Sequence, residues 1–380
     1  MSAPATEPRE DSLAEGRRTL ALCDVCGFCT GFCPVFRATG ERPALTTTDI
    51  AYLANLCHNC RACWYACQYA PPHPFAINVP ATLARVRFQT YRDHVWPRAF
   101  APLMTHSAAA TLVVALLASL LVPLTTLLAV PPERLFASHR VAGAFYEVIP
   151  WGLMSALAGL SLGWALLALA IGGLRFWRDT APTPPRPISL QAWPTASRDL
   201  LTLRHLDGGG GGCNDHDDRF TQRRRLFHLA LLHGFLLCVA ATLTAALYHH
   251  LFDWPAPYPV LSAPVLLGTL GGLGLLVGVI GLLLVKLGAD PEPTAAETLP
   301  ADYALLGLIG AVAVSGLILL VLRETPAMGL LLAWHLGTVL AFFLMMPYGK
   351  FVHGLYRALA LLRHAAEARS SSRTTPTDRS

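Results

Sequence analysis

Six long apolar segments, separated by polar loops, occupy most of the chain after residue 100. None of these segments contains Asp, Glu, Lys or Arg, and none alternates apolar and polar residues as a strand of a membrane barrel would. A helix that rises about 1.5 Å per residue needs about 20 residues to cross a hydrocarbon layer of about 30 Å. The pattern therefore predicts six membrane-spanning helices, at residues 106–130, 148–174, 226–251, 264–285, 303–322 and 327–347.

The polar stretches around these segments divide the chain into parts. Five consecutive glycines at residues 208–212 follow a proline-rich stretch, a composition typical of a flexible linker. The expected fold class is an all-α membrane protein with an N-terminal ferredoxin-type helical domain and a six-helix transmembrane bundle. We expect a cytoplasmic domain at 1–100, two spanning helices within 101–180, a cytoplasmic linker at 181–225, four spanning helices within 226–356, and a disordered cytoplasmic tail at 357–380.

Composition agrees with a lipid-embedded chain, because 53% of the residues are apolar and only 14% are charged. The loop at 175–225 carries nine arginines, whereas the loop at 251–264 carries no positive charge. By the positive-inside rule, both termini face the cytoplasm, so we expect a multi-pass protein of the cytoplasmic (inner) membrane. The first 18 residues do not resemble a secretory signal. The arginines lie beside apolar segments rather than in an aromatic-interleaved patch, so nucleic acid is not an expected partner.

Eight of the ten cysteines lie in two motifs near the N-terminus, and both have the spacing Cys-x2-Cys-x2-Cys-x3-Cys. Three thiolates at intervals of three wrap around one iron–sulfur cubane, and the fourth ligates the neighbouring cluster. The motifs therefore predict two [4Fe-4S] clusters. The first is bound by Cys23, Cys26, Cys29 and Cys67, and the second by Cys57, Cys60, Cys63 and Cys33.

Zinc is the structural alternative, since sites made of four cysteines also bind zinc. Zinc sites usually combine two separated cysteine pairs, and the doubled quartet therefore favours iron–sulfur clusters. The first motif is followed by Pro34, as in small bacterial ferredoxins, whereas the second is followed by Gln68.

Four histidines in or near the apolar segments are candidate axial ligands of b-type haem: His228, His249, His335 and His353. His335 and His353 are 18 residues apart, which on one continuous helix gives a common face and an axial separation of about 27 Å. Since the third segment leaves the cytoplasm and the sixth returns, His228 matches His353 in depth and His249 matches His335. One or two bis-histidine haem sites follow, although Pro347 can kink the helix. The alternative for each histidine is an interfacial residue with a satisfied hydrogen bond.

Lys350 follows the sixth segment and is a candidate contact for a haem propionate or a quinone head group. The alternative is an ammonium group that extends from an apolar environment to the membrane surface.

The segments at residues 56–73 and 347–353 resemble the tricarballylate and citrate utilisation protein B family, and the resemblance extends over most of the chain from Cys23. It implies that a separate FAD-dependent dehydrogenase oxidises tricarballylate or a similar tricarboxylate. The B protein would reoxidise that flavin through its clusters and haem. Related sequences also occur beside flavoproteins of cobalamin synthesis. The last four spans also resemble, more weakly, b-haem subunits of respiratory nitrate reductases and heterodisulfide-reductase-like complexes.

These observations predict a membrane electron-transfer component that takes electrons from a flavoprotein and delivers them to quinone. The sequence lacks a dinucleotide fingerprint, a Walker loop and a nucleophile motif, so a stand-alone dehydrogenase is not expected. One alternative is an electron-transfer subunit of another flavoprotein or of a heterodisulfide-reductase-like complex. Another is a redox-coupled transporter, which would normally place ionisable groups at mid-membrane. A redox sensor would need neither two clusters nor six spans.

Overall fold

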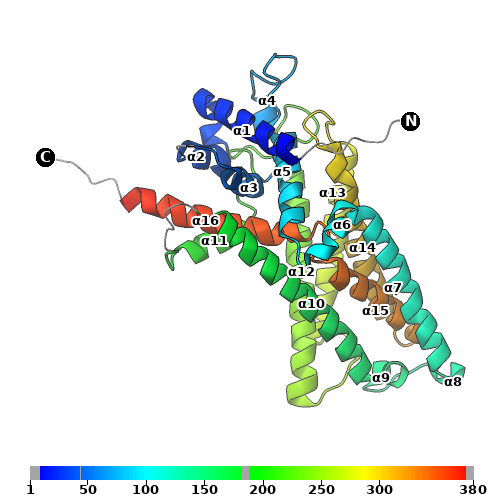
Figure 1. Ribbon diagram of the computed structural model, residues 1–380. Coiled ribbons are helices and arrows are strands. Elements are labelled where there is room, and N and C mark those ends of the chain that lie inside the picture. The colour runs from blue at the N-terminus through cyan, green and yellow to red at the C-terminus, as the bar shows by residue number, and fades with distance from the viewer. Residues whose placement is uncertain (1–8, 43, 182–187, 374–380) are drawn as a thin grey trace, which may run out of the picture.

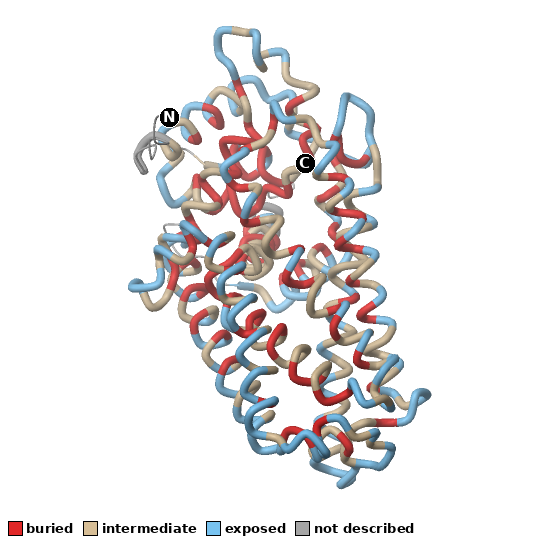
Figure 2. The backbone as a smooth tube through the Cα atoms, turned by 90° about the vertical axis from the view of Figure 1, so that its right-hand side faces the viewer, coloured by how far each residue is buried: buried red, intermediate tan, exposed pale blue. Residues whose placement is uncertain are grey.

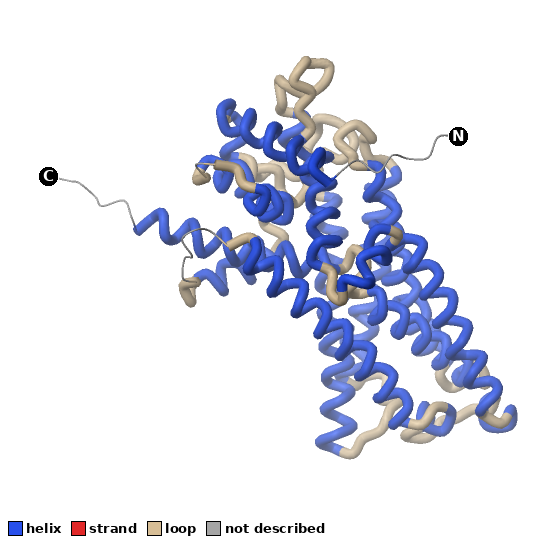
Figure 3. Tube along the Cα trace, in the orientation of Figure 1, coloured by secondary structure: helices blue, strands red, loops and turns tan. Residues whose placement is uncertain are grey.

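The structure, a computed structural model, describes residues 9–42, 44–181 and 188–373 (Figure 1). Within these ranges the regular elements are α-helices and short 3-10 turns, with one isolated antiparallel bridge between Cys213 and Thr221 (Figure 3). The expected all-α class is therefore confirmed. A compact cysteine domain lies at one end of a bundle of long helices.

The cysteine domain begins with short helices around the two motifs. Helix α1 ends at Cys26, where Gly27 adopts a left-handed conformation that only glycine reaches without strain. A reciprocal capping box between Thr46 and Asp49 starts α3. The elements of this domain are α1 (Arg9–Cys26), η1 (Phe28–Gly31), α2 (Pro34–Gly40), α3 (Thr47–Leu56), α4 (Ala62–Tyr65) and α5 (Val79–His94).

Six helices of the bundle are long and apolar enough to cross a membrane, and they coincide with the six predicted segments. Many large apolar side chains lie exposed along their outer faces, as lipid contact requires (Figure 2). The helices are α7 (Ser107–Ala129), α10 (Trp151–Asp179), α12 (Arg223–Phe252), α13 (Ala263–Leu287), α14 (Leu299–Leu322, preceded by η3, Ala296–Thr298) and α15 (Met328–Met345).

Helices α12 and α13 approach each other closely through glycines. A methyl group on Gly234 would lie 2.8 Å from the carbonyl oxygen of Gly271, so neither position has room for a side chain. Small residues at such a crossing let two membrane helices pack backbone to backbone. The connecting elements of the bundle are η2 (Arg98–Phe100), α6 (Ala101–Thr105), α8 (Pro132–Leu135) and α9 (Ala144–Val148).

The prediction of a disordered tail from residue 357 is wrong as far as residue 373, because α16 (Val352–Arg373) continues through it. Ala360, Leu361 and Ala365 of α16 are buried in the core of the cysteine domain. The Glu367 carboxylate pairs with Arg42 of that domain at 3.1 Å. Burial of these apolar residues holds the last helix against the first domain, and Figure 1 shows it crossing between domain and bundle. Residues 374–380 lie outside the described residues.

The prediction of a flexible linker is also wrong for the described part of 181–225. Helix α11 (Ala192–Leu201) packs against α16, and its Ala192 and Ala196 join the core of the cysteine domain. The glycine run that follows adopts positive φ at Gly208, Gly209, Gly210 and Gly212, which explains the glycines as a requirement of a tight, packed loop. Residues 182–187 of the linker lie outside the described residues.

The expectation that His335 and His353 share one helix is wrong. Helix α15 ends at Met345 and α16 begins at Val352. Pro347 explains the break, because proline lacks the N–H of a helical hydrogen bond and disfavours helical geometry in the residue before it. The calculated alignment of the two histidines therefore does not apply.

Candidate metal centre

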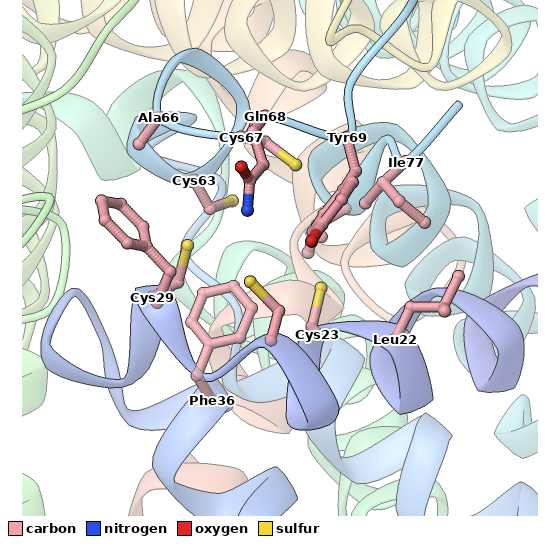
Figure 4. A pocket seen from close by; sticks show the side chains of 13 residues that line it. Leu22, Cys23, Cys29, Phe36, Cys63, Ala66, Cys67, Gln68, Tyr69 and Ile77 are labelled. Carbon is pink, nitrogen blue, oxygen red and sulfur yellow. The ribbon is translucent and has the colours of Figure 1, made fainter. Parts of the chain in front are cut away.

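Five motif thiols line one cavity of about 170 Å³ in the cysteine domain: Cys23, Cys26, Cys29, Cys63 and Cys67. Figure 4 shows the sulfur atoms of Cys23, Cys29, Cys63 and Cys67 directed into this common space. Helix α1 supplies the first two cysteines and η1 supplies Cys29, while α4 and the turn after it supply the other two. The two motifs therefore meet at one place although 23 residues separate Cys33 from Cys57.

Burial and neighbouring thiols raise the pKa of several motif cysteines, and these interactions cross the two predicted groups, since Cys60 raises the pKa of Cys29. The pKa of Cys23 is raised to about 12, first by burial and then by three neighbours, Cys29, Cys67 and Cys26. The pKa of Cys33 is raised by burial and then by Cys60 and Cys57, and these three thiols also raise the pKa of Cys63. Such thiols stay protonated at neutral pH unless a metal ion holds them as thiolates.

The donor set fits an iron–sulfur cluster better than a single ion. Among the described residues, no three His, Cys, Asp or Glu side chains converge as tightly as one metal ion requires. Zn–S bonds of about 2.3 Å would draw tetrahedral sulfurs to about 3.8 Å from one another. A wide ring of thiols around a cavity of about 170 Å³ leaves room for a multi-iron core. The assignment of individual ligands to each cluster stays a prediction.

Buried arginines surround the second motif, and the sequence interpretation missed them. Arg87 and Arg357 both donate to the carbonyl oxygen of Cys57, Arg357 at 2.9 Å. Arg224 donates to the carbonyl oxygen of Asn59 at 2.7 Å, and Arg61 donates to that of Asp215 at 3.0 Å. In the sequence, Arg224 is one of the nine loop arginines that indicate the orientation in the membrane. No sequence pattern links Arg357 with Cys57.

The glycine loop is part of the same site. The Asn214 N–H donates to the carbonyl oxygen of Cys60 at 3.0 Å, and Cys213 packs with Cys60 and Ala62 in a small buried cluster. Gly209 lies so close to Phe32, beside Cys33, that a methyl group there would be 3.3 Å from the Phe32 Cα. The predicted linker therefore forms one wall of the second motif.

The first motif lies at the surface instead. Cys26 is exposed, and its neighbours Val25 and Phe28 are 89% and 65% exposed. Two apolar side chains beside an exposed cysteine contrast with the second motif, where Cys57 and Cys60 are buried.

His228 of α12 and His353 of α16 lie side by side, with ring centroids 6.2 Å apart. Two imidazoles on opposite sides of one metal ion, with metal–nitrogen bonds of about 2.0–2.1 Å, have ring centres roughly 6 Å apart. The Nδ1 of His353 is hydrogen-bonded to the Lys350 carbonyl at 2.6 Å, which fixes the ring and leaves Nε2 for a metal. The buried Nδ1 of His228 has no hydrogen-bond partner among the described residues. This pair fits a bis-histidine haem.

The second predicted pair has different neighbours. The His249 ring stacks on Trp151 at 5.0 Å and also contacts Tyr146. The Nδ1 of His335 shares a hydrogen bond of 2.9 Å with the Ser315 hydroxyl. The pairing of His249 with His335 stays a prediction, without the ring contact that joins His228 and His353.

Lys350 lies in an ion-paired group near the same place. Its ammonium is 3.0 Å from the Asp302 carboxylate, and Lys286 binds the other oxygen of Asp302 at 2.6 Å. Burial lowers the pKa of Lys350, and Asp302 opposes that shift. The ammonium therefore already has an acidic partner.

A family model described as Citrate utilization protein B matches residues 105–374, and one described as Citrate utilization protein B Fer4-like domain matches residues 16–93. The chain belongs to the citrate utilization protein B family. A curated relative from Escherichia coli, named Citrate utilization protein B, is 46% identical over 365 residues, covering 96% of this chain and 94% of the relative. No solved structure matches the chain. The Fer4-like match covers both cysteine motifs, so this family member carries an iron–sulfur type of domain on a bundle that can span a membrane.

Proposed function

We propose that this protein is the membrane electron-transfer component of an oxidoreductase system for a tricarboxylate such as tricarballylate or citrate. It accepts electrons from a separate FAD-dependent dehydrogenase and passes them to the quinone pool. The observation that carries the proposal is the meeting of the two cysteine motifs around one cavity, beside six helices that can span a membrane. Membership of the citrate utilization family supports the substrate class.

The residues that would hold the cofactors are the eight cysteines, for two [4Fe-4S] clusters, and the pair His228 and His353, for a b-type haem. These groups, when bound, accept and release single electrons, which links a two-electron flavin to the membrane. The chain itself contributes buried thiols, a ring fixed through His353 Nδ1, and arginines that hold the second motif in place.

The exposure of the first motif supports contact with the flavoprotein at that surface. Val25 and Phe28 offer an apolar patch next to Cys26, whereas the second motif is covered by arginines and by the glycine loop. Electrons would therefore enter at the first motif and leave through the second. The nine arginines at 175–225 support a cytoplasmic position for the cysteine domain and both termini. Quinone as the acceptor rests on the family resemblance.

Metal and haem content provide the direct test. We would purify the full chain anaerobically in detergent and quantify iron, acid-labile sulfide, zinc and haem. The proposal expects about eight non-haem iron and eight sulfide per chain, with a b-type optical band after reduction with dithionite. Zinc in place of iron would overturn the proposal at its first step.

Function is tested separately in proteoliposomes that contain a quinone. Addition of the reduced flavoprotein should oxidise its flavin and reduce the quinone, and His353→Ala should stop quinone reduction while leaving the cluster signals in place. Uptake of a labelled tricarboxylate without any electron donor would instead support the transporter alternative.

A further inference from the structure

Two buried guanidinium groups next to the second motif have no acidic partner. Arg87 is 5% exposed, and the buried Nε of Arg357 has no hydrogen-bond partner within the described part of the chain. Both side chains donate to one acceptor, the carbonyl oxygen of Cys57. Among the residues that the structure describes, neither forms an ion pair with a carboxylate. Two like charges therefore share one neutral oxygen.

Three other cations of this region are paired with carboxylates. Arg224 binds the Asp215 carboxylate at 3.3 Å, and Lys286 and Lys350 bind the two oxygens of Asp302. Among the described residues Arg61 also has no carboxylate partner, but its donors meet three separate acceptors, whereas Arg87 and Arg357 converge on one carbonyl oxygen. Burial of an unpaired charge is costly, and a pair of them calls for a nearby anion.

The position of the two guanidiniums indicates which anion this is. Arg357 follows His353 by one helical turn on α16, and its charge acts on the His353 ring. Arg87 lies one turn before Tyr91 on α5, and the Tyr91 ring stacks on Tyr356 at 5.5 Å. Because Arg87 shares the Cys57 carbonyl oxygen with Arg357, the two guanidinium groups lie together, and Arg357 is one helical turn from His353. A guanidinium fork matches the geometry of a carboxylate.

This inference rests on the proposed haem between His228 and His353. We propose that Arg87 and Arg357 bind the propionate carboxylates of that haem, in the role that the sequence suggested for Lys350. Arg357 would then hold the Cys57 carbonyl and a haem carboxylate with the same guanidinium. One side chain would fix the position of the second cysteine motif relative to the haem.

Haem and its dimethyl ester provide the test, because the ester has the same ring and iron but no carboxylate charge. The full chain is produced in haem-deficient cells, purified in detergent and titrated optically with each compound. The wild type should bind haem about tenfold or more tightly than the ester, since hydrogen bonds to charged groups are lost with the ester. In the double variant Arg87→Met/Arg357→Met the preference should fall to within about threefold, as in a double-mutant cycle.

Arg363→Met is the matched control. Arg363 is also a buried arginine on α16, but it donates to Thr180 and Trp177 away from the histidine pair. This variant should keep the full preference for haem over the ester. Lys350→Met should also keep most of the preference, because Asp302 already pairs with that ammonium.

The outcomes separate the inference from the function on which it rests. An unchanged preference in the double variant would overturn the inference. So would a variant that loses iron and sulfide while keeping the preference, since the arginines would then balance the charge of the second cluster. A wild type that binds neither compound would instead refute the haem part of the proposed function.

Discussion

The two cysteine motifs share one spacing but occupy different environments. The first lies at the surface, with Cys26, Val25 and Phe28 exposed. In the second, Cys57 and Cys60 are buried, and the carbonyl groups of Cys57 and Asn59 accept hydrogen bonds from arginines of α5, α12 and α16. The spacing of the cysteines therefore predicts the type of cluster that a motif holds. The surrounding chain determines whether that motif is open to a partner protein or enclosed by other helices. The difference gives the proposed relay a direction.

Replacing one cysteine of each motif should give the largest effect and separates the two environments. Cys26→Ala and Cys60→Ala should each remove about four iron per chain, because each belongs to one predicted cluster. Only Cys60→Ala should also lower haem content, since the Cys60 side chain belongs to the buried cluster that packs against Leu229 and Leu232 of α12, the helix that carries His228. Iron, sulfide and haem analysis of the purified proteins measures both effects. Equal haem loss in both variants would contradict the comparison.

Removal of the Arg61 side chain should give the next largest effect. Arg61 is 5% exposed and donates to the carbonyl groups of Asp215 and Asp290 and to the Thr294 hydroxyl. Arg61→Met leaves these acceptors without their donor, which should lower the free energy of unfolding by about 2–4 kcal/mol. Thermal unfolding in detergent measures the loss. Arg37→Met, on α2 near the first motif, is the control. An equal loss of unfolding free energy in that variant would show that the arginines near the second motif are no more important for stability than those near the first.

Phe28→Ser tests the exposed surface of the first motif. A side chain that is 65% exposed contributes little to folding, so stability should change by no more than about 0.5 kcal/mol. Reduction of the protein by its flavoprotein partner should slow about tenfold, because exposed aromatic residues act as anchors in interfaces. Stopped-flow mixing measures the rate. An unchanged rate would place the contact with the flavoprotein elsewhere.

A pH effect on α1 should be the smallest. The hydrogen bond from Arg18 lowers the pKa of Glu15, against burial, which raises it. A carboxyl group with a lowered pKa in the folded protein stabilises the fold above its unfolded pKa, and this contribution disappears as the pH falls through the folded value. The pair is largely exposed, so Arg18→Gln should cost only about 0.3–0.5 kcal/mol at pH 6. The difference from wild type should vanish toward pH 3 in denaturant titrations.

The sequence predicted the features that depend on local patterns. The six spans follow from segments without charge, and the two cysteine groups follow from spacing. Contacts between distant parts were not predictable in this way. The face of α16 that packs into the cysteine domain includes small residues such as Ala360 and Ala365. Alanines contribute little to a hydrophobic pattern, so the sequence does not reveal this contact. The glycine run has the composition of a flexible linker, although its positive φ angles belong to a packed loop.

The sequence paired His228 with His353, but one assumption behind this pairing, a single continuous helix that carries His335 and His353, is wrong. His228 and His353 were paired by depth, with His353 and His335 on one helix, and the ring contact instead depends on the break after Met345. The unpaired arginines were not predictable, because Cys57, Arg87 and Arg357 meet only after α5 and α16 pack together.

The position of α16 imposes an order on biosynthesis. The cysteine domain leaves the ribosome first, yet part of its core, Ala360 to Ala365, is translated last. At ~5–20 residues per second, the interval is roughly a quarter of a minute to a minute. During that time the six long helices are synthesised, and the core of the cysteine domain stays incomplete because α16 does not yet cover it. A machinery that delivers metal clusters would therefore meet the completed core of this domain only after α16 has been translated.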